Sequence, residues 1–143
     1  MAHILVINGV NLNMLGIREK ALYGDQNLPA LEAYVRAEAD KLGHNVELYQ
    51  SNYEGDIVTK IQQAYGKMDG IIINAGAYTH TSVAILDALK AVSIPTVEVH
   101  LTDIKSREEF RNFSYISLYA EVMYAGYGFG GYKMALEYFS NKK

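Results

Sequence analysis

Half of the 143 residues are hydrophobic, a fifth are charged, the net charge is −3, and there is no cysteine. This balance fits one globular domain over residues 1–143 and disfavours a nucleic-acid partner, while the lack of cysteine excludes disulfides, thiolate nucleophiles and cysteine-ligated metals. No run approaches the ~20 apolar residues of a membrane span. The start of the chain lacks signal-peptide features, so we expect a cytoplasmic protein without membrane contact.

Strands and helices alternate along the chain. An apolar run at 3–8 predicts the first strand, and a loop rich in glycine, asparagine and charge follows. Apolar residues then recur at helical spacing from Leu28, after the potential N-cap Asn27, until Gly43. The later expected elements are a strand at 45–50, a helix at 54–65, a strand at 70–74, a helix at 82–92, a strand at 95–99, a polar helical segment at 105–111, a strand at 118–125 and a helix at 130–139.

Repeated strand–helix alternation predicts a parallel sheet with helices on both faces. Right-handed crossovers leave few topologies, and we expect an α/β fold, a flavodoxin-like three-layer sandwich with a five-stranded parallel sheet. In open sheets of this kind, ligands bind beyond the carboxyl ends of the strands. The first, third and fourth strands are neighbours in this order, so the segments that follow them should meet at one rim.

Polar side chains gather at that expected rim: Asn8, Asn11, Asn13, Asn74, His80, Glu98 and His100, with Arg18, Glu19 and Tyr23 in the first loop. Each has a structural explanation when taken alone. Asn-Gly sequences commonly form turns, and a buried carboxylate at a strand end needs hydrogen-bond partners in any case. The coincidence of all these groups at one rim favours a functional site.

These residues, taken in order, resemble the motifs of the type II 3-dehydroquinate dehydratases. The likeness covers essentially the whole chain. It rests on NGVNLNMLG at 8–16, Arg18-Glu19, Tyr23-Gly24, QSNYEG at 50–55, IINAGAYTHTS at 72–82, Asp87, EVHL at 98–101, REEFR at 107–111, GYG at 126–128 and Gly131-Tyr132. The chain departs from the family pattern at Val10, where the family usually has proline, and at 118–122, which is more polar and aromatic.

The resemblance implies a hydro-lyase without cofactor or metal, which converts 3-dehydroquinate to 3-dehydroshikimate through an enolate. The reaction serves the shikimate pathway of aromatic amino acid biosynthesis, or quinate use. Tyr23 is the implied base, and Arg18 would lower its pKa from about 10. Asn13 would act on the enolate oxygen through a water. His80 would protonate the leaving hydroxyl as general acid, with Glu98 holding its other ring nitrogen.

The resemblance also implies the substrate contacts and the assembly. Backbone amides of Leu101 and Thr102 would hold the carboxylate, and His100 would donate to the enolate region or to the substrate. The family assembles as a dodecamer built from trimers. The ring hydroxyls would therefore be bound by Asn74, by Arg111 and by Asp87 of a neighbouring subunit. The loop at 15–25 would close as a lid.

Other classes of protein use the same fold. A flavin binder needs a hydroxyl-rich phosphate loop after the first strand, which 8–13 lacks, although Tyr53 and Tyr78 are candidates to stack on a flavin. A phosphoacceptor domain needs clustered aspartates where this chain has asparagines. A non-catalytic scaffold is the remaining alternative, and the complete set of polar site residues disfavours it.

Overall fold

The computed structural model describes residues 2–17 and 26–142, so the predicted site residues Arg18 and Tyr23 lie outside the described residues. The strands are β1 (His3–Asn8), β2 (Asn45–Gln50), β3 (Gly70–Asn74), β4 (Thr96–His100) and β5 (Val122–Ala125). The helices are α2 (Leu28–Leu42), α3 (Glu54–Gln63), α4 (Val83–Val92) and α5 (Gly130–Asn141). Short 3-10 helices are η1 (Leu12–Met14), η2 (Gly76–His80), η3 (Ile104–Ser106), η4 (Glu109–Arg111) and η5 (Ile116–Leu118).

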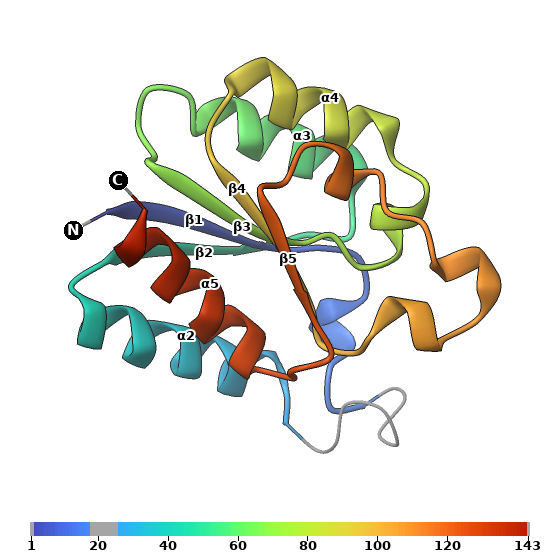
Figure 1. The fold of residues 1–143 in the computed structure, drawn as a ribbon, viewed down its shortest axis with the longest axis horizontal. Coiled ribbons are helices and arrows are strands. Elements are labelled where there is room, and N and C mark those ends of the chain that lie inside the picture. The colour runs from blue at the N-terminus through green and yellow to red at the C-terminus, as the bar shows by residue number, and fades with distance from the viewer. Residues whose placement is uncertain (1, 18–25, 143) are drawn as a thin grey trace.

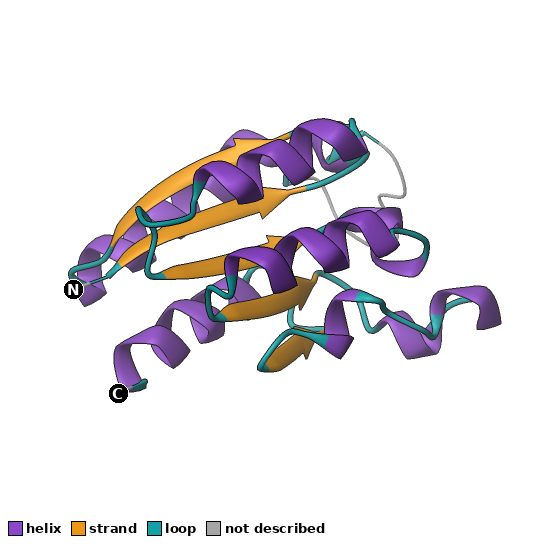
Figure 2. Cartoon of the chain, turned by 90° about the horizontal axis from the view of Figure 1, so that it is seen from above, coloured by secondary structure: helices purple, strands orange, loops and turns teal. Residues whose placement is uncertain are grey.

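The five strands form one sheet in the order β2-β1-β3-β4-β5, and every neighbouring pair is parallel. Helices α2 and α5 cover one face, and α3 and α4 cover the other (Figure 1). Figure 2 shows the strands pointing the same way between these two layers. The predicted flavodoxin-like α/β sandwich is therefore confirmed. Within the described residues, no helix is long and apolar enough to cross a membrane.

Local sequence signals fix the ends of α2 as predicted. The Asn27 side chain accepts a hydrogen bond from the backbone N–H of Ala30 at 3.0 Å, which satisfies one of the free donors of the first turn. Gly43 ends the helix at φ 75°, a left-handed conformation that glycine adopts without steric cost. The apolar stripe of this helix, Leu31, Val35 and Ala39, is fully buried.

The central strands β3 and β4 are buried along their whole length. The two faces of the sheet carry separate hydrophobic clusters, one beneath α2 and α5 and the other beneath α3 and α4. Complete burial of one large aliphatic side chain is worth about 1.5–3 kcal/mol, so the three consecutive isoleucines at 71–73 hold the middle of the sheet in place. A rigid central sheet gives fixed positions to the polar residues at its carboxyl edge.

Three predicted elements differ from the structure. The strand at 118–125 begins only at Val122, because 116–118 forms η5 and the first backbone bond to β4 runs from Glu121 N to Thr96 O. The helix at 54–65 ends at Gln63, and Tyr65 is 70% exposed rather than packed on the apolar face. The segment at 105–111 forms two 3-10 turns, of which the first begins where the Asp103 side chain accepts from Lys105 N.

The amino edge of the sheet brings the two ends of the chain together (Figure 1). Ala2 N donates to Nδ1 of the buried His44 at 3.2 Å. Nε2 of the same ring contacts Ser140 Oγ at 2.7 Å. One imidazole thus joins the residue before β1 to the last turn of α5. Ala2 and Lys142 line the same shallow cleft beside it.

Candidate functional site

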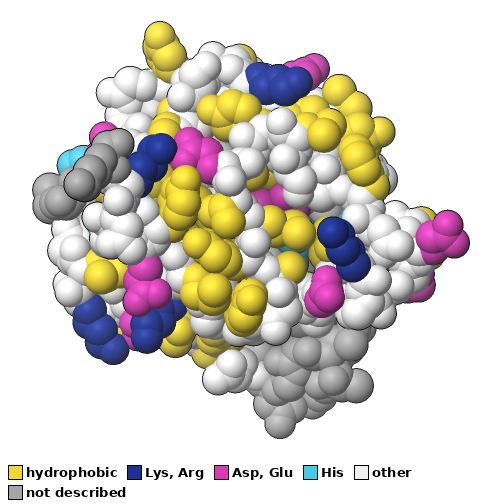
Figure 3. Space-filling view, viewed as in Figure 1, with side chains coloured by type: hydrophobic (Ala, Val, Ile, Leu, Met, Phe, Trp, Pro, Cys, Tyr) yellow, Lys and Arg dark blue, Asp and Glu magenta, His cyan; other side chains and the backbone are white. Residues whose placement is uncertain are grey.

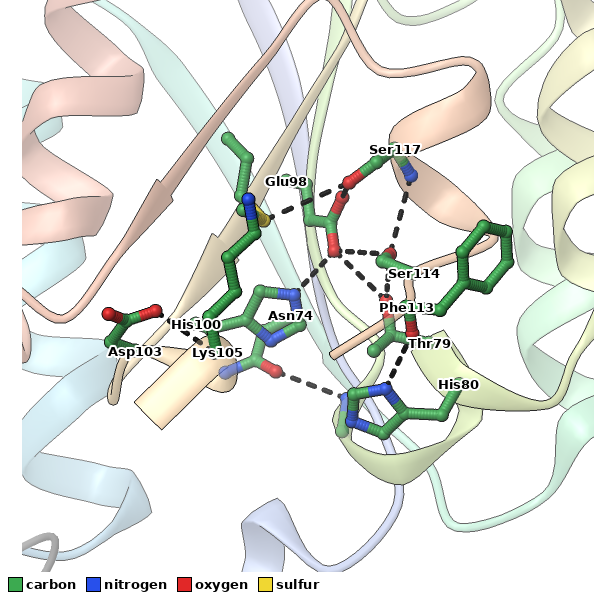
Figure 4. A network of polar contacts seen from close by, with 12 residues as sticks. Asn74, Thr79, His80, Glu98, His100, Asp103, Lys105, Phe113, Ser114 and Ser117 are labelled. Carbon is green, nitrogen blue, oxygen red and sulfur yellow. Dashed lines mark hydrogen bonds and ion pairs between the residues drawn. The ribbon is translucent and has the colours of Figure 1, made fainter. Parts of the chain in front are cut away.

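A pocket lies at the carboxyl edge of the sheet, where β1, β3 and β4 end. Its lining combines asparagine, histidine and arginine side chains with aliphatic ones: Val10, Asn11, Leu12, Leu15, Asn74, Gly76, Ala77, His80, His100, Leu101, Thr102, Ile104, Arg107 and Arg111. The rim predicted from the strand order is thus a real concave surface. Figure 4 shows the polar residues at this edge: the His100 ring points to Glu98 on the same strand, and the His80 ring points to Phe113.

The turn after β1 brings Asn11, rather than the predicted Asn13, to the pocket. Asn11 has a left-handed backbone at φ 70°, and its N–H donates to Asn52 Oδ1 at 2.9 Å. The following 3-10 turn buries Leu12 and Leu15 and points Asn13 to solvent. Asn13 is not among the pocket-lining residues. In a 3-10 turn, with three residues per turn, residues two apart point in different directions, so Asn11 and Asn13 do not share a side.

Asn74, at the end of β3, is held on both sides of its amide. Its Oδ1 accepts from Gly76 N at 3.1 Å, and its Nδ2 donates to the hydroxyl of Tyr132 at 3.2 Å. That hydroxyl in turn donates to Asn8 Oδ1 at 2.6 Å. Burial raises the pKa of Tyr132, so the phenol stays neutral. These bonds fix the orientation of Asn74, whose amide nitrogen has two N–H donors.

Glu98 and His100 form a buried pair. They are two residues apart on β4 and so point to the same face, and His100 Nε2 lies 2.5 Å from Glu98 Oε2. Glu98 is 0% exposed. Burial by itself would raise the pKa of this carboxyl, but the hydrogen bond and charge of His100 and the hydroxyls of Ser114 and Ser117 lower the pKa below its ordinary value. Glu98 is therefore a carboxylate, and the proton between the two groups lies on His100 Nε2.

The predicted contact between Glu98 and His80 is wrong. His80 Nδ1 instead contacts the backbone oxygen of Phe113 at 2.8 Å. A carbonyl oxygen only accepts, so Nδ1 carries a proton and donates it to Phe113 O. The reason for the difference is position, because Glu98 lies inside the sheet whereas His80 lies at the outer end of η2.

Two arginines supply positive charge to the pocket wall. Arg107 and Arg111 both line it, and Arg111 Nε donates to Glu108 at 3.2 Å. Leu101 and Thr102 line it as expected. Asp87 is exposed on α4 and is not among the lining residues, so its expected contact from a neighbouring subunit stays a prediction. Among the described residues, no group of three or more His, Asp or Glu side chains is arranged to hold a metal ion.

Comparison with known proteins connects this pocket to one family. The family model named dehydroquinase class II matches residues 2–140. The chain belongs to the dehydroquinase class II family. It is 54% identical to a catabolic 3-dehydroquinase 2 of Neosartorya fischeri, over 96% of this chain and 92% of that protein. It is 49% identical to a 3-dehydroquinate dehydratase of Clostridium acetobutylicum, over 96% of each chain.

Solved structures agree with this assignment. The crystal structure of the type II dehydroquinase from Butyrivibrio crossotus matches with a TM-score of 0.94 and 48% identity, over 98% of this chain and 97% of that chain. The type II dehydroquinase from Propionibacterium acnes matches with a TM-score of 0.94 at 37% identity, over 98% and 97% of the two chains. The flavin-binding and non-catalytic alternatives gain no support from these findings.

Sequence reasoning missed several residues of this dehydroquinase site. Arg107 was noted only as part of the REEFR motif, yet it lines the pocket together with Arg111 four positions later. Ser114 and Ser117 stand outside all the predicted motifs, and both donate a hydrogen bond to Glu98. Ser114 follows the last residue of that motif by three positions, and Ser117 follows Ser114 by three more. This spacing was the available signal, because residues three apart lie on one side of a helical turn.

Proposed function

We propose that this chain is a type II 3-dehydroquinate dehydratase, which eliminates water from 3-dehydroquinate to give 3-dehydroshikimate through an enolate. The observation that carries the proposal is the buried Glu98–His100 pair, which opens on a pocket with two arginines in a member of the dehydroquinase class II family. The substrate is an anion, and the positive wall favours its entry. The reaction needs a base, donors for an enolate oxygen and an acid for the leaving hydroxyl.

The first step removes a proton next to the ketone. We assign it to Tyr23 as tyrosinate, with Arg18 stabilising the phenolate charge, and both assignments stay predictions on the resemblance. Negative charge then develops on the ketone oxygen. The position of Asn11 in the pocket wall supports it, in place of Asn13, as the residue that acts on this oxygen through a water.

The second step expels the hydroxyl as water, and the hydrogen bonds favour His100 over His80 as its proton donor. A His100 ring that keeps Nε2–H against the Glu98 carboxylate can take a second proton, because the adjacent anion stabilises the imidazolium. His100 then gives a proton to the leaving oxygen, the C–O bond breaks, and the enolate electrons form the new C=C bond. His80 has a carbonyl beside it, which offers no comparable charge.

The remaining residues bind the substrate. His80 would form a hydrogen bond with a ring hydroxyl through Nε2, and Asn74 would bind another hydroxyl. Arg111, with Asp87 of a neighbouring subunit, completes the expected hydroxyl contacts. The backbone at Leu101 and Thr102 stays our assignment for the carboxylate, and the lining position of Arg107 supports it there as a further cation.

We also propose the dodecamer of trimers that the resemblance implies. The edge strand β5 is half-buried along its length, and hydrophobic side chains gather over β5 and α5 on the face in Figure 3. An uncovered edge strand tends to pair with another chain, which supports assembly. Sedimentation at several protein concentrations tests this, and a monomer at all of them would contradict it. The cytoplasmic location stays a prediction, which cell fractionation tests.

The decisive experiment adds 3-dehydroquinate to the purified protein and follows the near-ultraviolet absorbance of the conjugated product. The matched variants are His100→Asn and His80→Asn. We expect His100→Asn to lower kcat by about 10²–10⁴-fold, as for loss of a general acid. We expect His80→Asn to act mainly on KM, by about fivefold for one lost hydrogen bond.

Tyr23→Phe should be nearly inactive, and borohydride should leave the wild type active because no imine forms. A folded wild-type protein that produces no enone would remove the proposed function. A larger kcat loss in His80→Asn than in His100→Asn would keep the function and reverse the two histidine roles.

A further inference from the structure

The buried Glu98 carboxylate is surrounded by three hydroxyl groups that lie behind the pocket. Ser114 Oγ donates to Oε2 at 2.6 Å, and Ser117 Oγ donates to Oε1 at 2.5 Å. Thr79 Oγ1 lies 3.0 Å from Oε2 and 2.7 Å from Ser114 Oγ. None of the three lines the pocket, and neither does Glu98, so their effect on a bound substrate passes through Glu98 and then His100 (Figure 4). We call Thr79, Ser114 and Ser117 the hydroxyl cradle.

The cradle is assembled from η2, which carries Thr79, and from η5 with the residues just before it, which carry Ser117 and Ser114. Tyr115 N donates to Thr79 O at 2.8 Å, which ties this segment to η2. Ser117 N donates to Ser114 Oγ at 3.3 Å, so the two serines share one helical turn. The hydroxyls are therefore already oriented toward the carboxylate before any substrate arrives. Groups that are oriented in advance stabilise a charge without reorganisation.

Glu98 has few other sources of stabilisation for its charge. Its neighbours across the sheet are Ile73 on β3 and Met123 on β5, and neither titrates. His100 is the titratable side chain with which Glu98 forms a hydrogen bond among the described residues. Without the hydroxyls, a carboxylate this deep in the protein would draw the shared proton away from His100 Nε2.

We propose that Ser114 and Ser117 are positioning residues of the dehydratase, whose hydroxyls keep Glu98 ionised and thereby keep a proton on His100 Nε2 throughout the reaction. This inference rests on the proposed function. When His100 gives its second proton to the leaving hydroxyl, the Glu98–His100 pair is left with one net negative charge. The cradle stabilises that charge, so the pair becomes a better proton donor, and the proton lost from His100 leaves in the product water.

The test compares Ser114→Ala, Ser117→Ala and the double variant with Ser106→Ala, whose hydroxyl bonds a backbone oxygen away from Glu98. A hydrogen bond to a charged group corresponds to about 1–2 pH units. We expect the acid limb of kcat to move up by about that amount in each single variant and further in the double variant. KM should change by less than about twofold. Ser117→Thr, which keeps the hydroxyl, should behave like the wild type.

The dependence on pH separates this role from a structural one. A cradle variant should lose rate progressively as the pH falls, whereas damaged packing lowers kcat equally at all pH values. Equal losses across the pH range in a folded variant, or an acid limb that coincides with that of the wild type, would overturn the proposal. If Ser114→Ala fails to fold, Ser117→Ala still decides, because Ser117 lies near the surface.

Infrared difference spectroscopy gives a readout without turnover. The band of the protonated Glu98 carboxyl is identified by its absence in Glu98→Gln. Its appearance should shift to higher pH in the cradle variants and stay in place in Ser106→Ala. If the cradle variants show this shift but the wild type does not convert 3-dehydroquinate, the dehydratase assignment is wrong and the role of the cradle stands. If the wild type is active but the cradle variants show no shift, the dehydratase assignment stands and the role of the cradle is wrong.

Discussion

Replacing Tyr132 by phenylalanine tests how strongly the buried amides of the pocket depend on one hydroxyl. Tyr132 is fully buried, and its hydroxyl accepts from Asn74 Nδ2 and donates to Asn8 Oδ1. Phenylalanine leaves one donor and one acceptor without a partner, and each such buried group costs about 1–3 kcal/mol. We therefore expect Tyr132→Phe to lower the free energy of unfolding by about 2–6 kcal/mol, a large share of the ~5–15 kcal/mol typical of a domain.

The assay is urea unfolding at one fixed protein concentration, with Tyr138→Phe as the matched control. The Tyr138 hydroxyl also forms a short bond, at 2.6 Å to Glu121, but at the surface. The control should change stability by less than about 0.5 kcal/mol, as is usual at exposed positions. Because Asn74 loses an anchor, KM should also rise in Tyr132→Phe. A Tyr132→Phe variant as stable as the control would refute the reasoning and mean that the two amides repair their own hydrogen bonds.

Three further predictions concern stability. The folded protein lowers the pKa of Glu98, so ionised Glu98 stabilises the fold at pH values above the ordinary carboxyl pKa of 4.5, and this stability is lost as the pH falls through the folded pKa. The free energy of unfolding should therefore depend less on pH in the acid range in Glu98→Gln than in the wild type. Equal slopes in the two proteins would contradict this. A Cβ on Gly9 would lie 2.3 Å from Ala75 O, so Gly9→Ala should cost at least ~3 kcal/mol by urea unfolding, whereas a neutral result would show that the two segments separate easily. Asn27→Ala removes the bond to Ala30 N and should cost about 1 kcal/mol, with Asn27→Ser as the variant that retains most of the stability.

Most of the sheet was predictable because buried strands and the ends of helices have recognisable sequence patterns. Fully apolar runs such as 71–73 predict central parallel strands, and a glycine after the last apolar residue of a helical pattern, as at 43, predicts a helix end. The predicted last strand begins too early because Leu118, Tyr119 and Ala120 are apolar or aromatic, as strand residues often are. Leu118 instead ends the 3-10 helix η5, and Tyr119 is its C-cap. The spacing of hydrophobic residues does not separate a strand from a 3-10 turn over so few positions.

The site was predictable as a set of residues but not as a set of contacts. The strand order alone brought His80, Glu98 and His100 to one rim. The alternation of side chains along a strand already puts Glu98 and His100, two residues apart, on one side of the sheet. The family resemblance pairs Glu98 with His80 instead, and the contacts of the two rings decide between these histidines. Asn11 and Asn13 are equally plausible in the sequence, and only the left-handed turn at Asn11 decides which faces the pocket.

The meeting of both chain ends at the amino edge of the sheet has a practical consequence. Ala2 and Lys142 share one cleft, on the side of the sheet away from the pocket. A short linker between them would let the chain be circularly permuted, with new ends cut into the exposed turn at Gly66. His44 forms hydrogen bonds with both Ala2, just before β1, and Ser140 in α5, so such a permuted protein should keep its pocket. We therefore expect the fold to form without the natural order of its elements along the chain.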